Sequence, residues 1–269
     1  MSKFISLIST ISLVLLFSCN TNPTQQENDD QRSSSDTLVY EIERLRYESD
    51  LPVESPDTAN QKTYFLASYP KFQDSTLNAY VRKIASFSNN PDIEYQSLEE
   101  SGKGFIQEFE EYQQLDYSSP WAWYKNIQVK IQENRPPYLG LAVIYEDFMG
   151  GAHGNYGTTF GNYHLKEKRE IRLTDIIRED QLDSLRAIAE SVFMKQEKLE
   201  ENDFSNYFFQ DDVFALNENF LLKEDSILFL YNVYEIKSYA EGITELEIPY
   251  KDIVHLMTPE ARELLHLQE

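Results

Sequence analysis

The sequence predicts an α+β fold in which antiparallel sheet packs against helices. Segments with apolar residues at alternate positions, typical of strands, are interspersed with segments whose apolar residues recur every three or four positions, typical of helices. Consecutive strand candidates follow one another closely, as strands do in antiparallel sheets. The chain has 269 residues, 41% of them hydrophobic and 13% aromatic, which is enough to fill a substantial core.

The first 36 residues differ from the rest of the chain. Lys3, an apolar run over residues 4–17 and small residues before Cys19 form the pattern of a bacterial lipoprotein signal. We therefore expect residues 1–18 to be a signal peptide and Cys19, the single cysteine, to carry lipid. The apolar run is shorter than the roughly 17–25 residues that span a bilayer. Residues 19–36 are polar and predict a flexible tether.

Asn20 follows the cysteine, where an aspartate often marks retention at the inner membrane. We therefore expect an envelope protein that is anchored in the outer membrane. The sequence does not decide between the periplasmic face and the surface face of that membrane.

Residues 37–119 form the first expected globular region. Its first strand should bury Leu38, Tyr40 and Ile42, and a second strand should end at Pro70. Helical spacing predicts one helix over residues 74–87, capped by Asp74 or Ser75, and another around 105–112, after Gly102 and Gly104 loosen the chain.

Residues 120–269 form the second expected region, although both regions could share one core. A long strand alternates apolar residues from Trp121 to Ile131, with Lys125 as the exception. The next strand is apolar on both faces and should be central. The remaining elements are expected as strands over 138–148, 156–165, 170–173, 226–236 and 243–248, and as helices after Thr174-Asp175, over 182–193 and from Pro259.

The loop that contains Gly150, Gly151, His153 and Gly154 is the most unusual local sequence and is a candidate binding or structural loop. Three glycines in five residues indicate special backbone geometry. A phosphate cradle is excluded because no helix is predicted directly after the glycines. We expect His153 to be a hydrogen-bonded anchor. The alternatives are a catalytic residue, or a metal ligand that His164 on the same hairpin could approach; no cofactor or metal site is expected.

Composition excludes several functions. The net charge of −22, which becomes about −23 when Lys3 is removed, repels nucleic acid and attracts basic partners. No motif of a catalytic nucleophile is present. Carboxylates that are close in sequence do not indicate an acid/base pair, because such pairs occur by chance among 46 acidic residues. Residues 94–116 and 197–225 are acidic. The aromatic residues of the second stretch favour core positions over exposed contacts.

Several blocks of the sequence resemble known envelope domains. The loop at 150–154, residues 162–165 and residues 171–177 occur in this order, and residues 234–242 follow, with Ile248-Pro249-Tyr250 after them. Together they are similar to the extracytoplasmic domain of unknown function in RsiV-type anti-sigma factors. The preceding region, with residues 69–72 and Leu77-Asn78, resembles the PdaC-type domain that accompanies a deacetylase. His164 and Lys168 depart from the pattern, which usually has an aspartate and a glycine there.

The resemblance implies binding rather than catalysis. RsiV-type proteins bind lysozyme through this region, and PdaC-type domains are not the catalytic part of the deacetylase. We expect no anti-sigma role, because the residues before Cys19 have the pattern of a signal. The leading expectation is a non-catalytic, lipid-anchored envelope protein that binds a basic protein such as a lysozyme. The alternatives are a peptidoglycan or glycan binder that uses Trp121 and Trp123, and an enzyme centred on His153.

Overall fold

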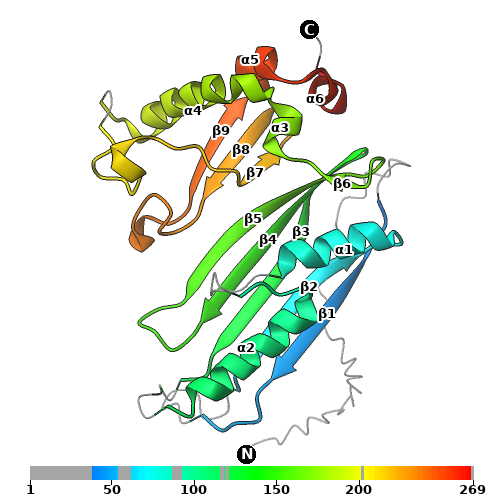
Figure 1. Cartoon of the computed structure of the whole chain (residues 1–269), viewed down its shortest axis with the longest axis vertical. Coiled ribbons are helices and arrows are strands. Elements are labelled where there is room, and N and C mark those ends of the chain that lie inside the picture. The colour runs from blue at the N-terminus through cyan, green and yellow to red at the C-terminus, as the bar shows by residue number, and fades with distance from the viewer. Residues whose placement is uncertain are drawn as a thin grey trace, which may run out of the picture. The chain divides into compact units, whose positions relative to one another are not determined.

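The computed structural model describes residues 38–53, 62–86, 93–115, 118, 121–200 and 203–267, and it confirms the α+β class (Figure 1). The expected signal peptide, Cys19 and the tether lie outside the described residues. Within the described residues, no helix has both the length and the apolar character that a membrane crossing requires.

Two sheets organise the chain. The larger has the strand order β1-β2-β3-β4-β5-β6, and the smaller has the order β7-β8-β9. The strands are β1 (Glu41–Glu48), β2 (Tyr64–Lys71), β3 (Tyr124–Arg135), β4 (Tyr138–Phe148), β5 (Asn155–His164), β6 (Arg169–Glu170), β7 (Phe220–Leu222), β8 (Ser226–Tyr231) and β9 (Thr244–Pro249). The α-helices are α1 (Ser75–Ala85), α2 (Leu98–Tyr112), α3 (Leu173–Ile176), α4 (Leu182–Glu197), α5 (Tyr250–Ile253) and α6 (Pro259–Leu264).

The larger sheet is antiparallel except between β2 and β3, which run parallel. A parallel pair needs a crossover connection, and α1 and α2 provide it. The expected boundary between residues 119 and 120 falls inside this crossover, so one sheet contains strands from both expected regions. β4 matches the expected strand, and it is largely buried between β3 and β5.

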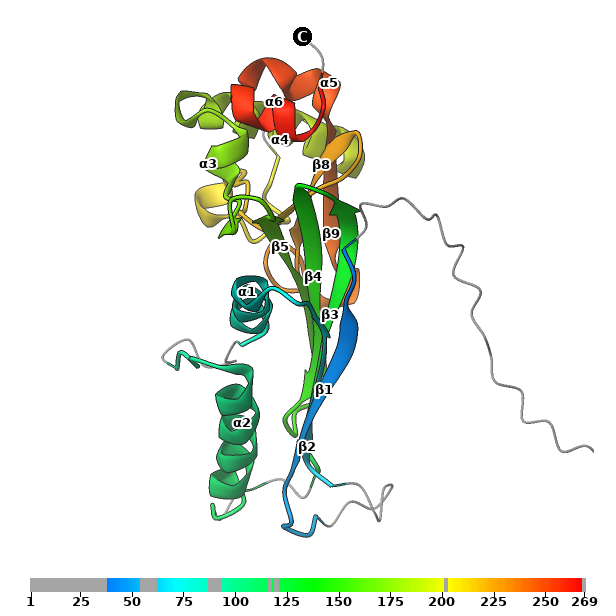
Figure 2. The same cartoon turned by 90° about the vertical axis from the view of Figure 1, so that its right-hand side faces the viewer.

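Both α1 and α2 cover the same face of the larger sheet (Figure 2). Asp74 caps α1 as expected, since its carboxylate accepts hydrogen bonds from the backbone N–H groups of Thr76 and Leu77. Gly102 does not loosen the chain as expected, because it lies inside α2. A Cβ there would come within 2.5 Å of Tyr47 and 2.8 Å of Phe65, so glycine allows the helix to lie close to the sheet.

The buried face of β1 was wrongly predicted, although Leu38, which precedes the strand, packs against the core as expected. Leu45 and Tyr47 pack toward the helices, whereas Tyr40 and Ile42 are 43% and 50% exposed. The expected alternation placed the apolar face one residue out of register, which exchanges the two faces of a strand. β1 is also an edge strand, and five of its eight residues are charged.

Lys125 was treated as an exception to the buried face of β3, and the structure places it on that face. Its side chain is only 3% exposed, and Asp147, 4% exposed, lies opposite it on β4. Burial lowers the pKa of Lys125 to about 8, although Asp147 and Glu108 act in the opposite direction.

The smaller sheet forms a second core with α4 and the segments around it. The aromatic residues of the acidic stretch contribute to this core, as the sequence favoured: Phe204, Phe209, Phe214 and Phe220 are buried, whereas Phe208 is 56% exposed. Phe220 belongs to β7, a strand that the sequence analysis missed. The predicted strand over 226–236 ends at Tyr231, and the chain then turns.

Asparagine side chains join the two sheets along β5. The Asn219 Oδ1 accepts a hydrogen bond from the Phe160 N–H at 2.8 Å, and the Asn232 Oδ1 accepts one from the Thr158 N–H at 2.7 Å. Buried Asn162 accepts from the Tyr138 hydroxyl at 2.6 Å and donates to the Phe220 carbonyl at 2.8 Å. These amides satisfy backbone and side-chain groups that lie between the sheets.

Replacing Asn162 by alanine should lower the free energy of unfolding by roughly 2–4 kcal/mol, because two buried polar groups lose their partner. Denaturant unfolding measures the loss. In a double-mutant cycle with Tyr138→Phe, we expect the two losses to be non-additive. Strictly additive effects would contradict the importance of this contact.

Gly102→Ala should destabilise the protein by about 1–3 kcal/mol through overpacking, although alanine normally stabilises a helix interior. Lys103→Ala, at the exposed neighbouring position, is the control and should have little effect on the melting temperature. A stabilised Gly102→Ala protein would show that α2 can move away from the sheet without cost.

Lys125 should make stability rise with pH. Its pKa in the folded state, about 8, lies below the unfolded value of about 10.4, so the unfolded state binds more protons between these values. The free energy of unfolding should therefore increase between about pH 8 and pH 9.5, by at most about 1.4 kcal/mol per pH unit. Lys125→Met should flatten this rise, and Lys130→Met, at an exposed position of the same strand, should preserve it. An equal slope in all three proteins would contradict the assignment.

Candidate functional site: an open sheet face and its tyrosine cluster

The Gly150–Gly154 loop joins β4 to β5 and lies at the surface. Gly150 has a φ of 85°, a backbone conformation that favours glycine. The His153 Nδ1 lies 2.8 Å from the Gly154 carbonyl, so it carries the proton in the neutral ring and donates it there. The Nε2 is then an acceptor for the Tyr234 hydroxyl at 3.3 Å. These are the contacts of a loop anchor.

Two of the sequence blocks meet at this loop. His153 stacks on Tyr239 with a ring-centroid distance of 4.1 Å, and Tyr156 meets Tyr239 edge to face at 5.6 Å. Tyr234 adopts a left-handed φ of 67° and is 54% exposed. We call His153, Tyr156, Tyr234 and Tyr239 the tyrosine cluster.

The sequence analysis considered that His153 and His164 could approach each other. In the structure they do not. They lie at opposite ends of β5, and a ten-residue strand spans roughly 33 Å. Across the described ranges, no three or more His, Cys, Asp or Glu side chains are grouped so that they could hold a metal ion.

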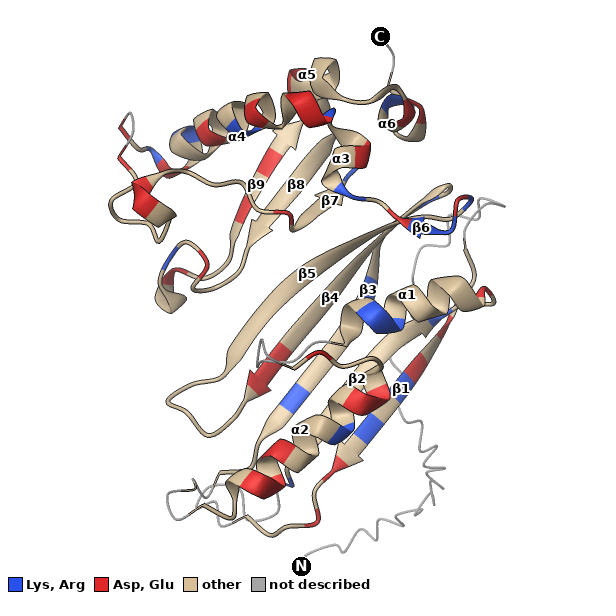
Figure 3. Cartoon of the chain, in the orientation of Figure 1, with Lys and Arg blue, Asp and Glu red and all other residues tan. Residues whose placement is uncertain are grey.

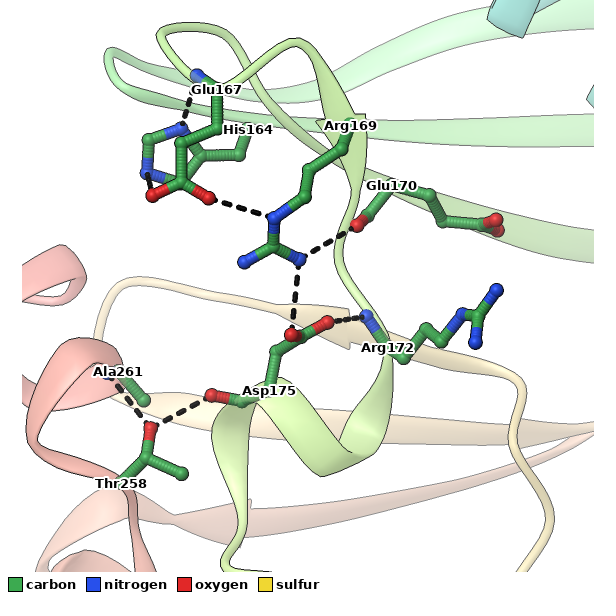
Figure 4. Close-up of polar contacts among 8 residues, drawn as sticks. All are labelled: His164, Glu167, Arg169, Glu170, Arg172, Asp175, Thr258 and Ala261. Atoms are coloured by element: carbon green, nitrogen blue, oxygen red, sulfur yellow. Dashed lines mark hydrogen bonds and ion pairs between the residues drawn. The ribbon is translucent and has the colours of Figure 1, made fainter.

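His164 belongs to a polar network in the turn between β5 and β6 (Figure 4). Its Nδ1 accepts a hydrogen bond from the Glu167 backbone N–H at 3.1 Å, as the carboxylate of an aspartate would. Lys168 has a left-handed φ of 55°, a conformation that favours glycine, the residue that the resemblance implies at this position. Both departures from the pattern therefore preserve the turn.

Arg169 extends the same network. It pairs with Glu167 at 2.7 Å and with Asp175 at 3.0 Å, and Asp175 also accepts a hydrogen bond from the Arg172 N–H. A cavity of about 320 Å³ lies beside these residues and α6. Because the charged groups already pair with one another, this network serves the turn and the start of α3.

The face of the larger sheet opposite α1 and α2 carries a wider feature. A groove of about 720 Å³, which we call the open-face groove, is lined mostly by residues at even positions of β2, β3, β4 and β5. Ile127, Tyr145, Gly157 and Ile243 complete the lining. Its half-buried or exposed lining includes Tyr64, Asn126, Gln128, Ile144, Glu146 and Tyr156. Ile144, Thr158 and Ile243 also line a second hollow of about 740 Å³ that reaches β8 and β9.

A row of aromatic rings crosses one end of the groove. Tyr64 and Tyr124, which are paired in register, stack at 6.1 Å, and Tyr124 stacks on Phe148 at the same distance. Burial, with Glu146 nearby, raises the pKa of Tyr124, so its hydroxyl stays neutral. Tyr156 belongs both to the groove and to the tyrosine cluster, which makes the two features continuous.

The acidic residues are concentrated elsewhere. α2 carries five glutamates and one lysine (Figure 3). Glu100 and Glu111 are exposed and lie about three turns apart, on the same side of the helix. α2 covers the sheet face opposite the groove, so an acidic surface and a groove with Glu146 as its single charged lining residue occupy different sides of the sheet.

The glycan-binding alternative requires Trp121 and Trp123 to be exposed so that sugars can stack on them, and the structure does not expose both. Trp123 is 5% exposed and packs against Phe105, Phe109 and Tyr112 in the core. Trp121 is 36% exposed.

The sequence analysis missed the groove residues, although the alternation in β2 and β3 placed Tyr64, Asn126 and Gln128 on one face. The missing information was that none of the described helices covers this part of the face.

The comparisons with known proteins agree with this architecture. Residues 174–251 match the family model described as Protein of unknown function (DUF3298), and residues 57–156 match the model described as Deacetylase PdaC. No curated protein matches the sequence.

Two solved structures resemble the chain over most of its length. A member of the DUF3298 family from Bacteroides fragilis is 26% identical, with a TM-score of 0.63, and the match covers 83% of this chain and 95% of that one. A DUF3298 family protein from Pseudomonas aeruginosa is 21% identical, with a TM-score of 0.66 and coverage of 84% and 97%, and it shows the same fold. The chain thus contains a region that matches the PdaC model followed by a region that matches the DUF3298 model.

Proposed function

We propose that this chain is a non-catalytic, lipid-anchored protein of the cell envelope that binds a cationic protein of the lysozyme kind. The observation that carries the proposal is the acidic surface on α2, in a chain with a net charge of −22. Such a surface raises the association rate of a cationic partner and makes binding sensitive to salt. The envelope location and the lipid on Cys19 remain predictions from the sequence.

The surroundings of His153 support a binding role over catalysis. Its two ring nitrogens are engaged by the Gly154 carbonyl and the Tyr234 hydroxyl, and its ring stacks on Tyr239. A general base needs a nitrogen directed at a substrate proton and a third group that orients the ring for that task. The tyrosine cluster instead holds the imidazole in place within the surface.

The proposal predicts that a basic lysozyme binds the protein and that high salt weakens the complex. Glu100→Gln/Glu111→Gln should reduce the affinity about three- to tenfold at low salt, because two exposed charges are lost without a change in side-chain size. Glu260→Gln/Glu263→Gln is the matched control: it removes two exposed charges from α6 and should change the affinity less than about twofold.

Surface binding kinetics at low and high salt, together with a lysis assay, would measure these effects. Absence of salt-dependent binding, together with undiminished lysis by the lysozyme, would overturn this function. Equal losses in the two double variants would show that net charge acts without a defined surface on α2.

A further inference from the structure

The open-face groove differs in chemistry from the rest of the surface. Charged residues make up 26% of the chain, yet only Glu146 is charged among the 13 residues that line the groove. A charged ligand would therefore lose hydration in the groove with few opposite charges to compensate for the loss. This composition favours an uncharged ligand.

The groove offers two kinds of contact along its length. The face of a tyrosine ring is electron-rich and attracts the weakly positive C–H groups of a saturated ring. Tyr156 supplies such a ring on β5. Tyr64 supplies one on β2, where the Arg46 guanidinium carbon lies 4.5 Å from the ring centroid and Tyr124 stacks beside it. Asn126, Gln128 and Thr158 supply amide and hydroxyl groups that can donate and accept hydrogen bonds.

Glu146 is held in place by its neighbour. The Asn126 Nδ2 donates a hydrogen bond to the Glu146 Oε1 at 2.7 Å, which orients the carboxylate at the groove. A carboxylate forms strong, charge-assisted hydrogen bonds with hydroxyl donors. The lining therefore suits a ligand with apolar ring faces and a rim of hydroxyl or amide groups.

We propose that the open-face groove binds a neutral oligosaccharide, plain or N-acetylated. An extended peptide fits less well, because β2, β3 and β4 are paired on both sides over the groove, and the side chains of Asn219 and Asn232 already occupy the outward backbone groups of Thr158 on β5. The site is independent of the proposed protein-binding surface, since α2 covers the opposite face of the sheet.

Isothermal titration calorimetry with three uncharged probes tests the proposal: an N-acetylglucosamine tetramer, a glucose tetramer and an uncharged tetrapeptide. At least one saccharide should bind, with an affinity that salt does not change. Tyr64→Ala and Tyr156→Ala should each weaken that binding about tenfold. Phe208→Ala, which removes an exposed ring from another part of the surface, should leave it unchanged.

Glu146→Gln keeps the size of the side chain and removes its charge, so it tests the groove even if an alanine variant fails to fold. It should weaken saccharide binding several-fold. Glu100→Gln/Glu111→Gln should not affect saccharide binding, which separates this site from the acidic surface. Absence of binding by both saccharides, equal affinities in the folded groove variants and the Phe208→Ala protein, or preferential binding of the peptide would each overturn the proposal.

Discussion

The asparagine side chains along β5 determine how the two sheets are joined. β5 pairs with β4 on one side, but on the other side β6 reaches only Tyr163 and His164. The backbone groups of Thr158 and Phe160 would lack partners there without the amides of Asn219 and Asn232. Because a buried backbone group without a hydrogen bond is costly, these amides take the place of a further strand.

This junction fixes the position of the smaller sheet against β5. In that position, a residue next to the smaller sheet forms part of the wall of the open-face groove. Ile243, which precedes β9, contributes to the groove wall together with residues of β4 and β5. The two helices of the β2–β3 crossover both pack on the other face, where they bury Phe65, Phe105 and Phe109. One face therefore holds a closed core, while the other stays partly uncovered.

Local sequence patterns predicted the elements well where the hydrophobic periodicity agrees with the positions of helix caps and of turns that contain glycine or proline. β4, α1 with its Asp74 cap, and the hairpins around residues 136–137 and 150–151 are examples. The patterns failed where a distant partner decides the outcome. Lys125 lies on the sheet face that α1 and α2 cover, and Gly102 is required by Tyr47, which is far away in sequence. The three-residue strand β7 has too few residues to show a period.

The site was predictable only in part. The glycine-rich loop was recognised as unusual and residues 234–242 as part of the resemblance, but no single segment could show that they meet through His153 and Tyr239. The groove depends on four strands in one register, and its residues look like ordinary exposed strand positions when each strand is read alone. Which face of a sheet stays open is a tertiary property.

The charged edge of β1 has a consequence for copies of this chain at high local concentration. An exposed strand edge is a template for pairing with another chain, and such pairing would extend the sheet from molecule to molecule. Glu41, Glu43, Arg44, Arg46 and Glu48 keep this edge hydrated, and desolvating them in a strand pair is unfavourable. Neighbouring molecules therefore tend to remain separate, and each keeps its open-face groove and the outer surface of α2 available to the surroundings.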